Sequence, residues 1–543
     1  MLWARLQPDK TAFTFMERGE DASEALTYLE LRNRAASIAQ TLIAAGLADK
    51  PVVLLYPPGL AFIEALLACF LAGVIAVPAP YPVTPRARRR IAGVASACEA
   101  RAVLTLDRYV TSRELRGAID GTDAIAEWIA TDSVATAATW PADAGRDWSP
   151  DDVALLQFTS GSTAAPRGVV ISFGNLAANH QMIAPSFGND ADEPSVTWLP
   201  MFHDMGLIGS VLYPLYACRT THIMPPFAFL QKPVRWLKAI TRLQATGSGA
   251  PSFAYDLCAR MIKPEDREGL DLRRWTTAFC GAESVRAKSL SLFAETFAPY
   301  GFDAHAFLPC YGLAEATLFV SGGAKGSGLR VSKSRDTIVS CGVGLKPQTL
   351  AIVDEHGQRL PEGAEGEIWV AGPHVSRGYW RNPAATRDAF GATLADEPGV
   401  AYLRTGDLGF IEAGELFVSG RSKDVIVIRG ANYHANDLDH TICDADPILL
   451  PGAGAVFALD EDGQQRIVAI QEVRKAAFAA LDHAALFRTI ARAVSVDHGI
   501  RLDRAVFVRE GRLPRTTSGK IQRHLCLPLL TQADGETEAS HAE

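Results

Sequence analysis

The spacing of apolar residues alternates between two periods along most of the chain. Helical spacing, with apolar residues three and four positions apart, covers Tyr28 to Ala45, Gln231 to Leu243 and Glu283 to Phe297. Short β-branched and apolar runs lie between such segments and predict buried strands at Val52–Tyr56, Ala102–Thr105, Val153–Phe158 and Ser195–Leu199. Because helices that alternate with short strands imply crossover connections, we predict an α/β fold whose large N-terminal domain has stacked, largely parallel sheets.

The stretch that comes nearest to a membrane span runs from Leu60 to Pro78 and holds one charged residue, Glu64. It contains Gly73, changes there from helix formers to a β-branched run, and ends in a proline-rich turn. A buried helix followed by a buried strand explains all of these features, so we predict no membrane span.

The character of the chain changes beyond Asn382. Short strands such as Leu416–Val418 and Val425–Ile428 are expected there, punctuated by Gly406, Gly409, Gly414, Gly420 and Gly430. We therefore expect a small β-subdomain at the end of an N-terminal domain of residues 1–420, then a hinge at 421–424 and a small, mobile α+β C-terminal domain at 425–530. The polar tail, 531–543, is expected to be disordered.

Composition and charge limit the possible partners. The chain has 543 residues, of which 48% are hydrophobic and 21% charged, as in a soluble protein of two or three domains. A formal net charge of −8 argues against nucleic acid as the main partner. The basic cluster at Arg86, Arg88, Arg89 and Arg90 is interpreted as a solvated helix face, with a docking patch for an acidic partner as the alternative.

Cysteine usage and the N-terminus indicate a compartment. The nine cysteines are scattered and never spaced as C-x-x-C, so neither a disulfide framework nor a zinc site is predicted. The first ten residues run into charge instead of into the apolar region of a signal peptide. A cytoplasmic location fits both observations.

Two cationic segments with glycines indicate phosphate chemistry. Thr159–Gly168 follows the predicted strand Val153–Phe158, and small or hydroxyl residues in such a place let backbone N–H groups surround phosphate oxygens. Arg515–Lys520 puts a lone lysine beside a glycine near the chain end, where a mobile element could bring a charge to a reacting phosphate. No G-x-x-x-x-G-K-[ST] string occurs, which excludes a P-loop NTPase. By itself, Thr159–Gly168 is equally compatible with an ordinary polar turn.

Three further strings lie between these two segments in the sequence and help to interpret them. Cys310–Thr317 holds an aromatic residue, a glycine and a carboxylate; Arg404–Gly409 holds a carboxylate in a tight bend; Gly420–Asp424 precedes the small domain. With Thr159–Gly168 and Lys520, they resemble the adenylate-forming superfamily of acyl-CoA synthetases, luciferases and peptide-synthetase adenylation domains.

Within that superfamily the chain most resembles the fatty acyl-AMP ligases, which activate a fatty acid with ATP and pass the acyl group to a carrier protein. The strings that carry this resemblance are Leu199–Gly209, Ser248–Cys258, Gly281–Arg286 and Val339–Gly342. A long stretch between Thr317 and Val339 is similar to the insertion of these ligases. No carrier segment with a phosphopantetheine serine follows, so we expect an acyl carrier protein in trans.

The resemblance implies a set of site residues, with ATP and Mg²⁺ as cofactors. Residues of the phosphate loop would cradle the β- and γ-phosphates: Thr159, Ser160, Gly161, Ser162, Thr163 and Arg167. Glu315 would hold Mg²⁺, and Lys520 would contact the α-phosphate and the attacking carboxylate; Arg421 is placed with these catalytic residues. The adenine and ribose would be bound by Gly281, Ala282, Glu283, Tyr311, Gly312, Asp407 and Arg421.

Two further positions have alternative interpretations. Lys423 falls at the superfamily's hinge, but an ordinary linker lysine is also possible. His203, grouped with Met205 and Gly206 at the acyl site, is either an aromatic gate or a packed histidine with a local hydrogen bond. The string around Asp204 disfavours amino-acid activation.

The chain departs from the superfamily pattern at four positions. Ala164 and Arg167 replace the usual glycine and lysine, and Ala435 and Asp439 replace the more common proline and glutamate. Phosphate affinity and contacts with the thiol partner could differ accordingly. An acyl-CoA synthetase is the nearest rival function, and a non-catalytic adenylate-binding scaffold is the rival of another class.

Overall fold

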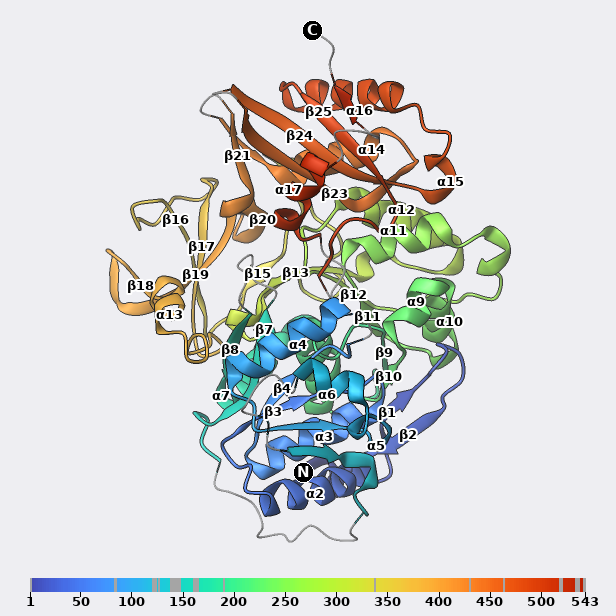
Figure 1. Cartoon of the computed structure of the whole chain (residues 1–543), viewed down its shortest axis with the longest axis vertical. Coiled ribbons are helices and arrows are strands. Elements are labelled where there is room, and N and C mark those ends of the chain that lie inside the picture. The colour runs from blue at the N-terminus through green and yellow to red at the C-terminus, as the bar shows by residue number, and fades with distance from the viewer. Residues whose placement is uncertain are drawn as a thin grey trace. The chain divides into compact units, whose positions relative to one another are not determined.

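The computed structural model describes residues 2–82, 85–119, 125, 127–136, 148–159, 166–188, 191–335, 338–428, 431–461, 464–516, 521–532 and 538–540. The chain divides into two units (Figure 1). The large unit comprises Met1–Thr405 and Phe410–Phe417, and the small unit comprises Gly406–Gly409 and Val418–Glu543.

The large unit alternates helices and strands as the apolar pattern predicts. Its strands are β1 (Thr11–Phe15), β2 (Glu24–Thr27), β3 (Pro51–Leu54), β4 (Ile75–Pro78), β5 (Ala102–Thr105), β6 (Glu127–Ala130), β7 (Val153–Thr159), β8 (Arg167–Ser172), β9 (Ser195–Thr197), β10 (Thr221–Ile223), β11 (Gly247–Gly249), β12 (Thr277–Cys280), β13 (Phe307–Gly312), β14 (Phe319–Gly322), β15 (Val343–Gly344), β16 (Thr349–Val353), β17 (Gly366–Ala371) and β18 (Phe390–Leu394). Two further strands, β19 (Glu397–Glu412) and β20 (Glu415–Arg421), run from this unit into the small one.

Its helices are α1 (Leu2–Leu6), α2 (Tyr28–Ala44), α3 (Leu60–Ala72), α4 (Pro85–Cys98), α5 (Asp107–Val110), α6 (Arg113–Ile119), α7 (Phe173–Phe187), α8 (Tyr213–Tyr216), α9 (Pro226–Gln231), α10 (Val234–Leu243), α11 (Ser252–Met261), α12 (Ala287–Phe297) and α13 (Pro383–Ala389). A π-helix, η2 (Met205–Leu212), precedes α8. Short 3₁₀ turns are η1 (Thr131–Ser133), η3 (Pro264–Arg267), η4 (Ala298–Tyr300), η5 (Ala304–Ala306) and η6 (Ala314–Ala316).

Two mostly parallel sheets form the large unit, which confirms the predicted fold class. The six-stranded sheet has the order β6-β5-β3-β4-β7-β8, and the nine-stranded sheet has the order β15-β14-β13-β12-β11-β9-β10-β1-β2. Antiparallel pairs occur near the sheet edges, at β7–β8, β1–β2, β13–β14 and β14–β15. A smaller sheet, β16-β17-β19-β18 with β20 on β19, is the expected β-subdomain.

Alternating side chains bury both faces of the six-stranded sheet. In β3, Val52 and Leu54 pack into a core with α2 and α3, whereas Val53 and the following Leu55 pack with α4 on the other face. The first of these cores also takes in Phe13 of β1, so it joins the two sheets through a shared apolar layer.

The small unit is an α+β structure with the same two-faced burial. It contains η7 (Ser422–Asp424), β21 (Val425–Ile428), β22 (Ala431–His434), α14 (Ala435–Ala445), β23 (Leu449–Glu461), β24 (Gln464–Val473), α15 (Lys475–Phe478), α16 (His483–His498), β25 (Arg504–Arg509), α17 (Arg523–Gln532) and β26 (Glu538–Ser540). Along β24, Ile467 and Ala469 face the core of α14 and α16, and Val468 and Ile470 face that of α17.

Several predicted elements have different ends in the structure. Helix α10 begins at Val234, because Pro233 precedes it and separates it from α9. Helix α12 begins at Ala287, four residues after the predicted start at Glu283. Strand β19 continues through Gly406 and Gly409, where short strands were expected, because glycine bends a strand without ending its pairing.

The prediction of a disordered tail is wrong for part of residues 531–543. Residues 531–532 end α17, and β26 pairs antiparallel with β25. The open edge of β25 offers main-chain hydrogen bonds that a polar segment can use, since they do not depend on side-chain hydrophobicity. Residues 533–537 and 541–543 lie outside the described part.

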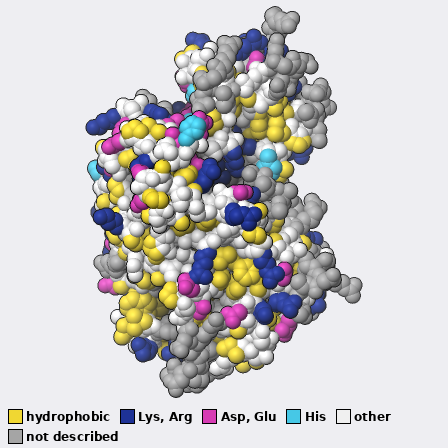
Figure 2. Space-filling model, turned by 90° about the vertical axis from the view of Figure 1, so that its left-hand side faces the viewer, with side chains coloured by type: hydrophobic (Ala, Val, Ile, Leu, Met, Phe, Trp, Pro, Cys, Tyr) yellow, Lys and Arg dark blue, Asp and Glu magenta, His cyan; other side chains and the backbone are white. Residues whose placement is uncertain are grey.

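The apolar stretch from Leu60 to Pro78 forms α3 and β4, as predicted. In the described part of the chain, no helix combines the length and hydropathy that a membrane crossing requires. On the face shown in Figure 2, lysine and arginine side chains of the large unit are interspersed with hydrophobic and acidic ones.

Candidate active site

The predicted phosphate loop connects two paired strands. Thr159 ends β7 and Arg167 begins β8, and these two residues are register partners in the antiparallel pair. Gly168 allows this closure, because a Cβ there would lie 2.9 Å from the Phe158 ring. The structure therefore brings the two ends of the loop together, while Ser160, Gly161, Ser162, Thr163 and Ala164 lie outside the described residues.

Glu315 and Arg167 meet at a tyrosine that sequence reasoning missed. The Tyr379 hydroxyl donates to Glu315 Oε1 at 2.8 Å, and the Arg167 guanidinium carbon lies 5.5 Å from the centroid of the tyrosine ring. Burial, and then the charge of Glu315, raise the pKa of Tyr379 well above its usual value. The phenol thus remains a hydrogen-bond donor at neutral pH.

The backbone around Glu315 is strained. Thr317 has φ 68° and ψ −61°, and Leu318 N–H donates to Ala316 O at 2.8 Å, which closes a γ-turn. The buried Thr317 hydroxyl donates to His374 O at 2.6 Å, and Ser376 N–H donates to Glu315 O at 2.9 Å. Such conformations persist where their surroundings determine them, and they cluster at functional sites.

At several of the predicted nucleotide-binding positions, close backbone contacts restrict which residue type can be present. A Cβ at Gly312 would lie 1.8 Å from Leu318 O, and one at Gly281 would lie 2.9 Å from Cys310 O. Ala282 has φ +69°, a conformation that is unfavourable for a residue with a side chain. Tyr311, Gly312 and Gly281 lie at the carboxyl ends of β13 and β12, which are adjacent parallel strands. Their loops therefore emerge at one edge of the nine-stranded sheet, where α/β proteins commonly bind ligands.

Glu283 has a structural contact beside its predicted role. Its Oε1 accepts a hydrogen bond from Phe253 N–H at 3.1 Å, in the first turn of α11. A carboxylate at a helix N-terminus compensates the unpaired N–H groups there. Sequence reasoning placed Glu283 at adenine and did not detect this helix contact.

The residues of the predicted acyl site surround the start of the π-helix η2. His203 Nδ1 lies 2.5 Å from Asp204 Oδ1, which also accepts from Met205 N–H. Met205 is buried in the core with Trp198, and a Cβ at Gly206 would lie 2.1 Å from Pro200 O. The short contact with Asp204 is compatible with the packed-histidine alternative and does not exclude the aromatic gate, and π-helical turns are frequent at functional sites.

The small unit contains the other predicted charged residues. Arg421 Nε lies 3.1 Å from Asp407 Oδ1, and Ser422 Oγ donates to Gly406 O at 3.1 Å. The structure thus brings Asp407 and Arg421 together, with Lys423 in the following turn η7. Lys520 and its neighbours 517–519 lie outside the described residues.

Ion pairs hold the chain on both sides of Lys520. Arg515 pairs with Ile521 in an antiparallel bridge and forms an ion pair with Glu472 at 2.9 Å. Arg523 forms an ion pair with Asp439. Burial raises the pKa of Asp439 to about 6, although the Arg523 charge opposes this rise.

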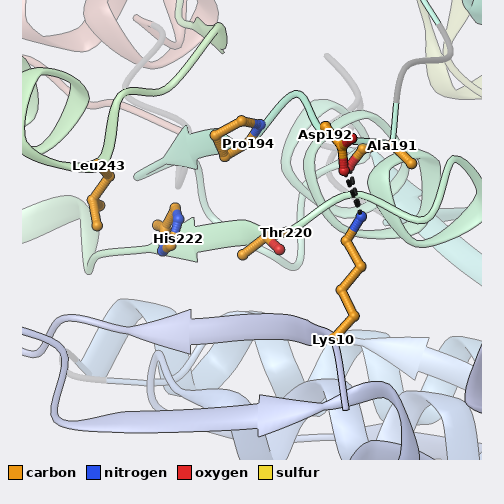
Figure 3. A pocket seen from close by; sticks show the side chains of 7 residues that line it. All are labelled: Lys10, Ala191, Asp192, Pro194, Thr220, His222 and Leu243. Atoms are coloured by element: carbon orange, nitrogen blue, oxygen red, sulfur yellow. Dashed lines mark hydrogen bonds and ion pairs between the residues drawn. The ribbon is translucent and has the colours of Figure 1, made fainter. Parts of the chain in front are cut away.

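A pocket of about 370 Å³ lies away from these residues (Figure 3). Lys10 reaches across it to Asp192 at 3.7 Å, near Pro194 and Thr220. Lys10, Pro194 and Thr220 immediately precede the parallel strands β1, β9 and β10. The pocket is therefore at the amino edge of the sheet, opposite the edge that carries Gly281 and Tyr311.

Among the described residues, no three His, Cys, Asp or Glu side chains gather into a group that could hold a metal ion. Glu315 supplies one hard carboxylate, which Tyr379 links to Arg167 at the end of the predicted phosphate loop. Mg²⁺ in nucleotide sites usually takes one or two carboxylates and completes its shell with phosphate oxygens and water. A single carboxylate here fits that mode of binding.

Comparisons with known proteins place this geometry in a family. The AMP-binding enzyme family matches residues 2–380, and the AMP domain of Disco-interacting protein 2-like proteins matches residues 423–539. The medium-chain-fatty-acid–acyl-carrier-protein ligase JamA of Moorena producens is 37% identical, over 96% of this chain and 92% of the relative.

Solved structures that resemble this chain indicate the same family. A fatty acyl-adenylate ligase from L. pneumophila, in complex with acyl adenylate and pyrophosphate, is 36% identical with a TM-score of 0.74, covering 98% of this chain and 95% of that one. A structure from work on the fatty acyl-adenylate ligases of E. coli and L. pneumophila is 28% identical with a TM-score of 0.86, covering 97% of each chain. The chain therefore belongs to the AMP-binding enzymes and, among them, to the fatty acyl-AMP ligases.

Proposed function

We propose that this enzyme activates a fatty acid with ATP to an acyl-adenylate and pyrophosphate, and then transfers the acyl group to the phosphopantetheine thiol of an acyl carrier protein in trans. The product would enter a lipid, polyketide or lipopeptide pathway. One observation carries the first step: the strained Glu315 turn, the end of the phosphate loop and Arg167 come together around Tyr379.

The chemistry requires positioning more than an enzyme nucleophile. An oxygen of the fatty acid carboxylate attacks the α-phosphorus, and the bond from that phosphorus to the bridging oxygen breaks as pyrophosphate leaves. Backbone groups and hydroxyls of residues 159–163, together with Arg167, would hold the β- and γ-phosphates. Lys520 would neutralise the charge that develops between the carboxylate and the α-phosphate. When bound through Glu315, Mg²⁺ supplies charge neutralisation for the phosphate oxygens.

The remaining residues would orient the two substrates. Asp407 and Arg421, which form an ion pair, would bind the ribose hydroxyls. The loops at Gly281–Glu283 and Tyr311–Gly312 would frame adenine, and the buried region around His203, Met205 and Gly206 would contact the acyl chain. In the second step the carrier thiol loses its proton to solvent and the sulfur attacks the acyl carbonyl; the bond from that carbon to the phosphate oxygen breaks, and AMP leaves with its electron pair.

We place this reaction in the cytoplasm. Support comes from the nine cysteines, which are thiols in the structure and are buried except for Cys310, which is partly exposed. Burial raises the pKa of Cys310 to about 12, so this thiol is protonated and weakly reactive at neutral pH.

The direct test incubates the protein with ATP, Mg²⁺ and a series of fatty acids and identifies the adenylate by mass. We expect acyl-AMP and fatty-acid-dependent ATP–pyrophosphate exchange. Coenzyme A and a phosphopantetheinylated carrier protein are then compared as acceptors. Rapid formation of acyl-CoA would favour an acyl-CoA synthetase, and a lack of exchange with every fatty acid would favour a non-catalytic adenylate-binding protein.

Substitution of Lys520 separates the two half-reactions. We expect Lys520→Ala to slow adenylation by about 10²- to 10³-fold, as removal of one charge-stabilising donor does in other enzymes. Transfer from preformed acyl-AMP should remain largely intact, because no pyrophosphate leaves in that step. The exposed Lys475 provides the control, Lys475→Ala, which should leave both rates unchanged. Equal loss of both steps in Lys520→Ala would contradict the assigned role.

A further inference from the structure

Tyr379 contacts both charged groups of the proposed phosphate site. Its hydroxyl donates to Glu315 Oε1 at 2.8 Å, while the face of its ring lies 5.5 Å from the Arg167 guanidinium carbon. Glu315 is separated from Tyr379 by 64 positions in the sequence, and Arg167 by more than 200. One side chain thus links three segments that the fold brings together.

The position of the Tyr379 side chain is fixed by its surroundings. The side chain is nearly buried, and its ring packs edge-on against Phe390 with centroids 5.4 Å apart. Its main chain is bridged to Val169 in β8, and Trp380 N–H donates to Gly168 O at 2.7 Å. The strand that begins with Arg167 therefore also holds the segment that carries the tyrosine.

The hydroxyl can act on the Glu315 carboxylate without ligating the metal itself. A hydrogen bond to Oε1 restricts rotation of the carboxylate and leaves the electron pairs of Oε2 to a cation.

Tyr379 acts on Arg167 through its ring as well as through a polar contact of its hydroxyl. A guanidinium held by cation–π attraction stays beside the phosphate loop with its N–H groups still available to an anion. The ring also keeps the guanidinium away from a direct ion pair with Glu315. Such an ion pair would compete with Mg²⁺ for the same carboxylate.

We propose that Tyr379 is a positioning residue that orients Glu315 toward Mg²⁺ and holds Arg167 beside the phosphate loop. This inference rests on the proposed function only in taking Glu315 as the carboxylate that receives Mg²⁺. It adds to the site a residue that binds neither substrate nor metal and that acts through the two groups it contacts.

The test uses Tyr379→Phe in the full-length protein, which removes the hydroxyl and keeps the ring. Binding of a non-hydrolysable ATP analogue is measured by calorimetry across a Mg²⁺ titration and in its absence. We expect the Mg²⁺ concentration for half-maximal enhancement of binding to rise about 10-fold or more, the usual effect of removing a hydrogen bond to a metal ligand. Binding without Mg²⁺ should fall less than binding with Mg²⁺, because Arg167 keeps the face of the ring and loses only its polar contact with the hydroxyl.

The chain offers a matched control. Tyr402 is fully buried and donates to the carboxylate of Glu397 at 2.6 Å, and both residues lie on β19. Tyr402→Phe removes the same kind of hydrogen bond away from the proposed site, so the Mg²⁺ midpoint should stay at the wild-type value. Thermal unfolding of both variants shows how much of any change comes from stability alone.

A double substitution separates positioning from general structural support. In a Glu315→Gln background the carboxylate charge is absent, so Tyr379→Phe should no longer shift the Mg²⁺ midpoint. An unchanged midpoint in Tyr379→Phe alone, or a shift equal to that of Tyr402→Phe, would overturn the inference. If the wild-type protein binds the analogue with Mg²⁺ but shows no fatty-acid-dependent exchange, the proposed function fails while the role of Tyr379 stands.

Discussion

A buried histidine that contacts the turn carrying Glu315 contributes to stability in a way that depends on pH. His374 accepts the Thr317 hydrogen bond through its carbonyl, and its side chain is fully buried. Neither of its ring nitrogens has a hydrogen-bond partner among the described residues. Burial lowers the pKa of this histidine to about 4, because a charged imidazolium would lose its hydration. The ring is therefore neutral in the folded protein over most of the accessible pH range.

This histidine should make the large unit sensitive to acid. Its folded pKa lies below the unfolded value of about 6.5, so its contribution to stability is complete above pH 6.5 and is lost as the pH falls toward 4. At pH 5 the loss is about 2 kcal/mol. The difference in unfolding free energy between pH 8 and pH 5, measured with urea, should be smaller by about 2 kcal/mol in His374→Phe than in the wild type. The exposed His356 is the control: His356→Gln should leave the difference as in the wild type, and an unchanged pH slope in His374→Phe would refute the assignment.

At the scale of elements, the segment around Lys520 is anchored to β24. The carboxylate of Glu472 is almost fully buried and accepts from Leu513 N–H at 2.7 Å, while Arg515 pairs with it at 2.9 Å. Glu472→Gln keeps the shape but removes the charge, which should lower the stability of the small unit by about 1–3 kcal/mol. Because Arg515 is five residues before Lys520, we expect adenylation to slow more than transfer from preformed acyl-AMP. Single-turnover rates of both steps measure this difference.

A surface ion pair in the same unit provides the comparison. Arg501 lies 3.3 Å from Asp503 and is mostly exposed, so Arg501→Ala should change stability by less than about 1 kcal/mol and should spare both steps. Equal slowing of adenylation and transfer in Glu472→Gln would mean that the buried pair supports the whole small unit and does not position the lysine segment.

The sequence predicted elements better than it predicted their ends. Apolar spacing reports which face is buried, and it correctly placed α2, β5 and β21. Apolar spacing does not report where the hydrogen bonding of an element stops. Helix α10 begins only after Pro233, and β19 continues through glycines that were expected to end strands. Strand β26 was missed because an edge strand can form from main-chain hydrogen bonds alone.

At the scale of the whole molecule, motifs in order predicted the family and most of the candidate residues. The family resemblance grouped Gly281–Glu283 with Tyr311 and Gly312, and in the structure these residues lie at the carboxyl ends of the parallel strands β12 and β13, which share one edge. Tyr379 could not be assigned to the site from the sequence, since its partners are distant in sequence. A lone aromatic residue in a loop also carries no signal for a contact between its hydroxyl and a carboxylate. For Glu283, the motif predicted a role in adenine binding, whereas its contact with the N-terminus of α11 appeared only in the structure.

The two units imply a last prediction about how the enzyme changes from one step to the next. Lys423 lies in η7, shortly after the large unit ends at Phe417. If rotation of the small unit uses the backbone torsions of Lys423, then Lys423→Pro, which fixes φ near −65°, should leave acyl-AMP formation within a few-fold of wild type but slow carrier loading by roughly tenfold or more. Lys423→Ala is the matched control, because it removes the same side chain and keeps φ free, so both steps should proceed. Carrier loading at the wild-type rate in Lys423→Pro would refute the hinge, and equal defects in the two variants would assign the effect to the lost ammonium group instead of the backbone.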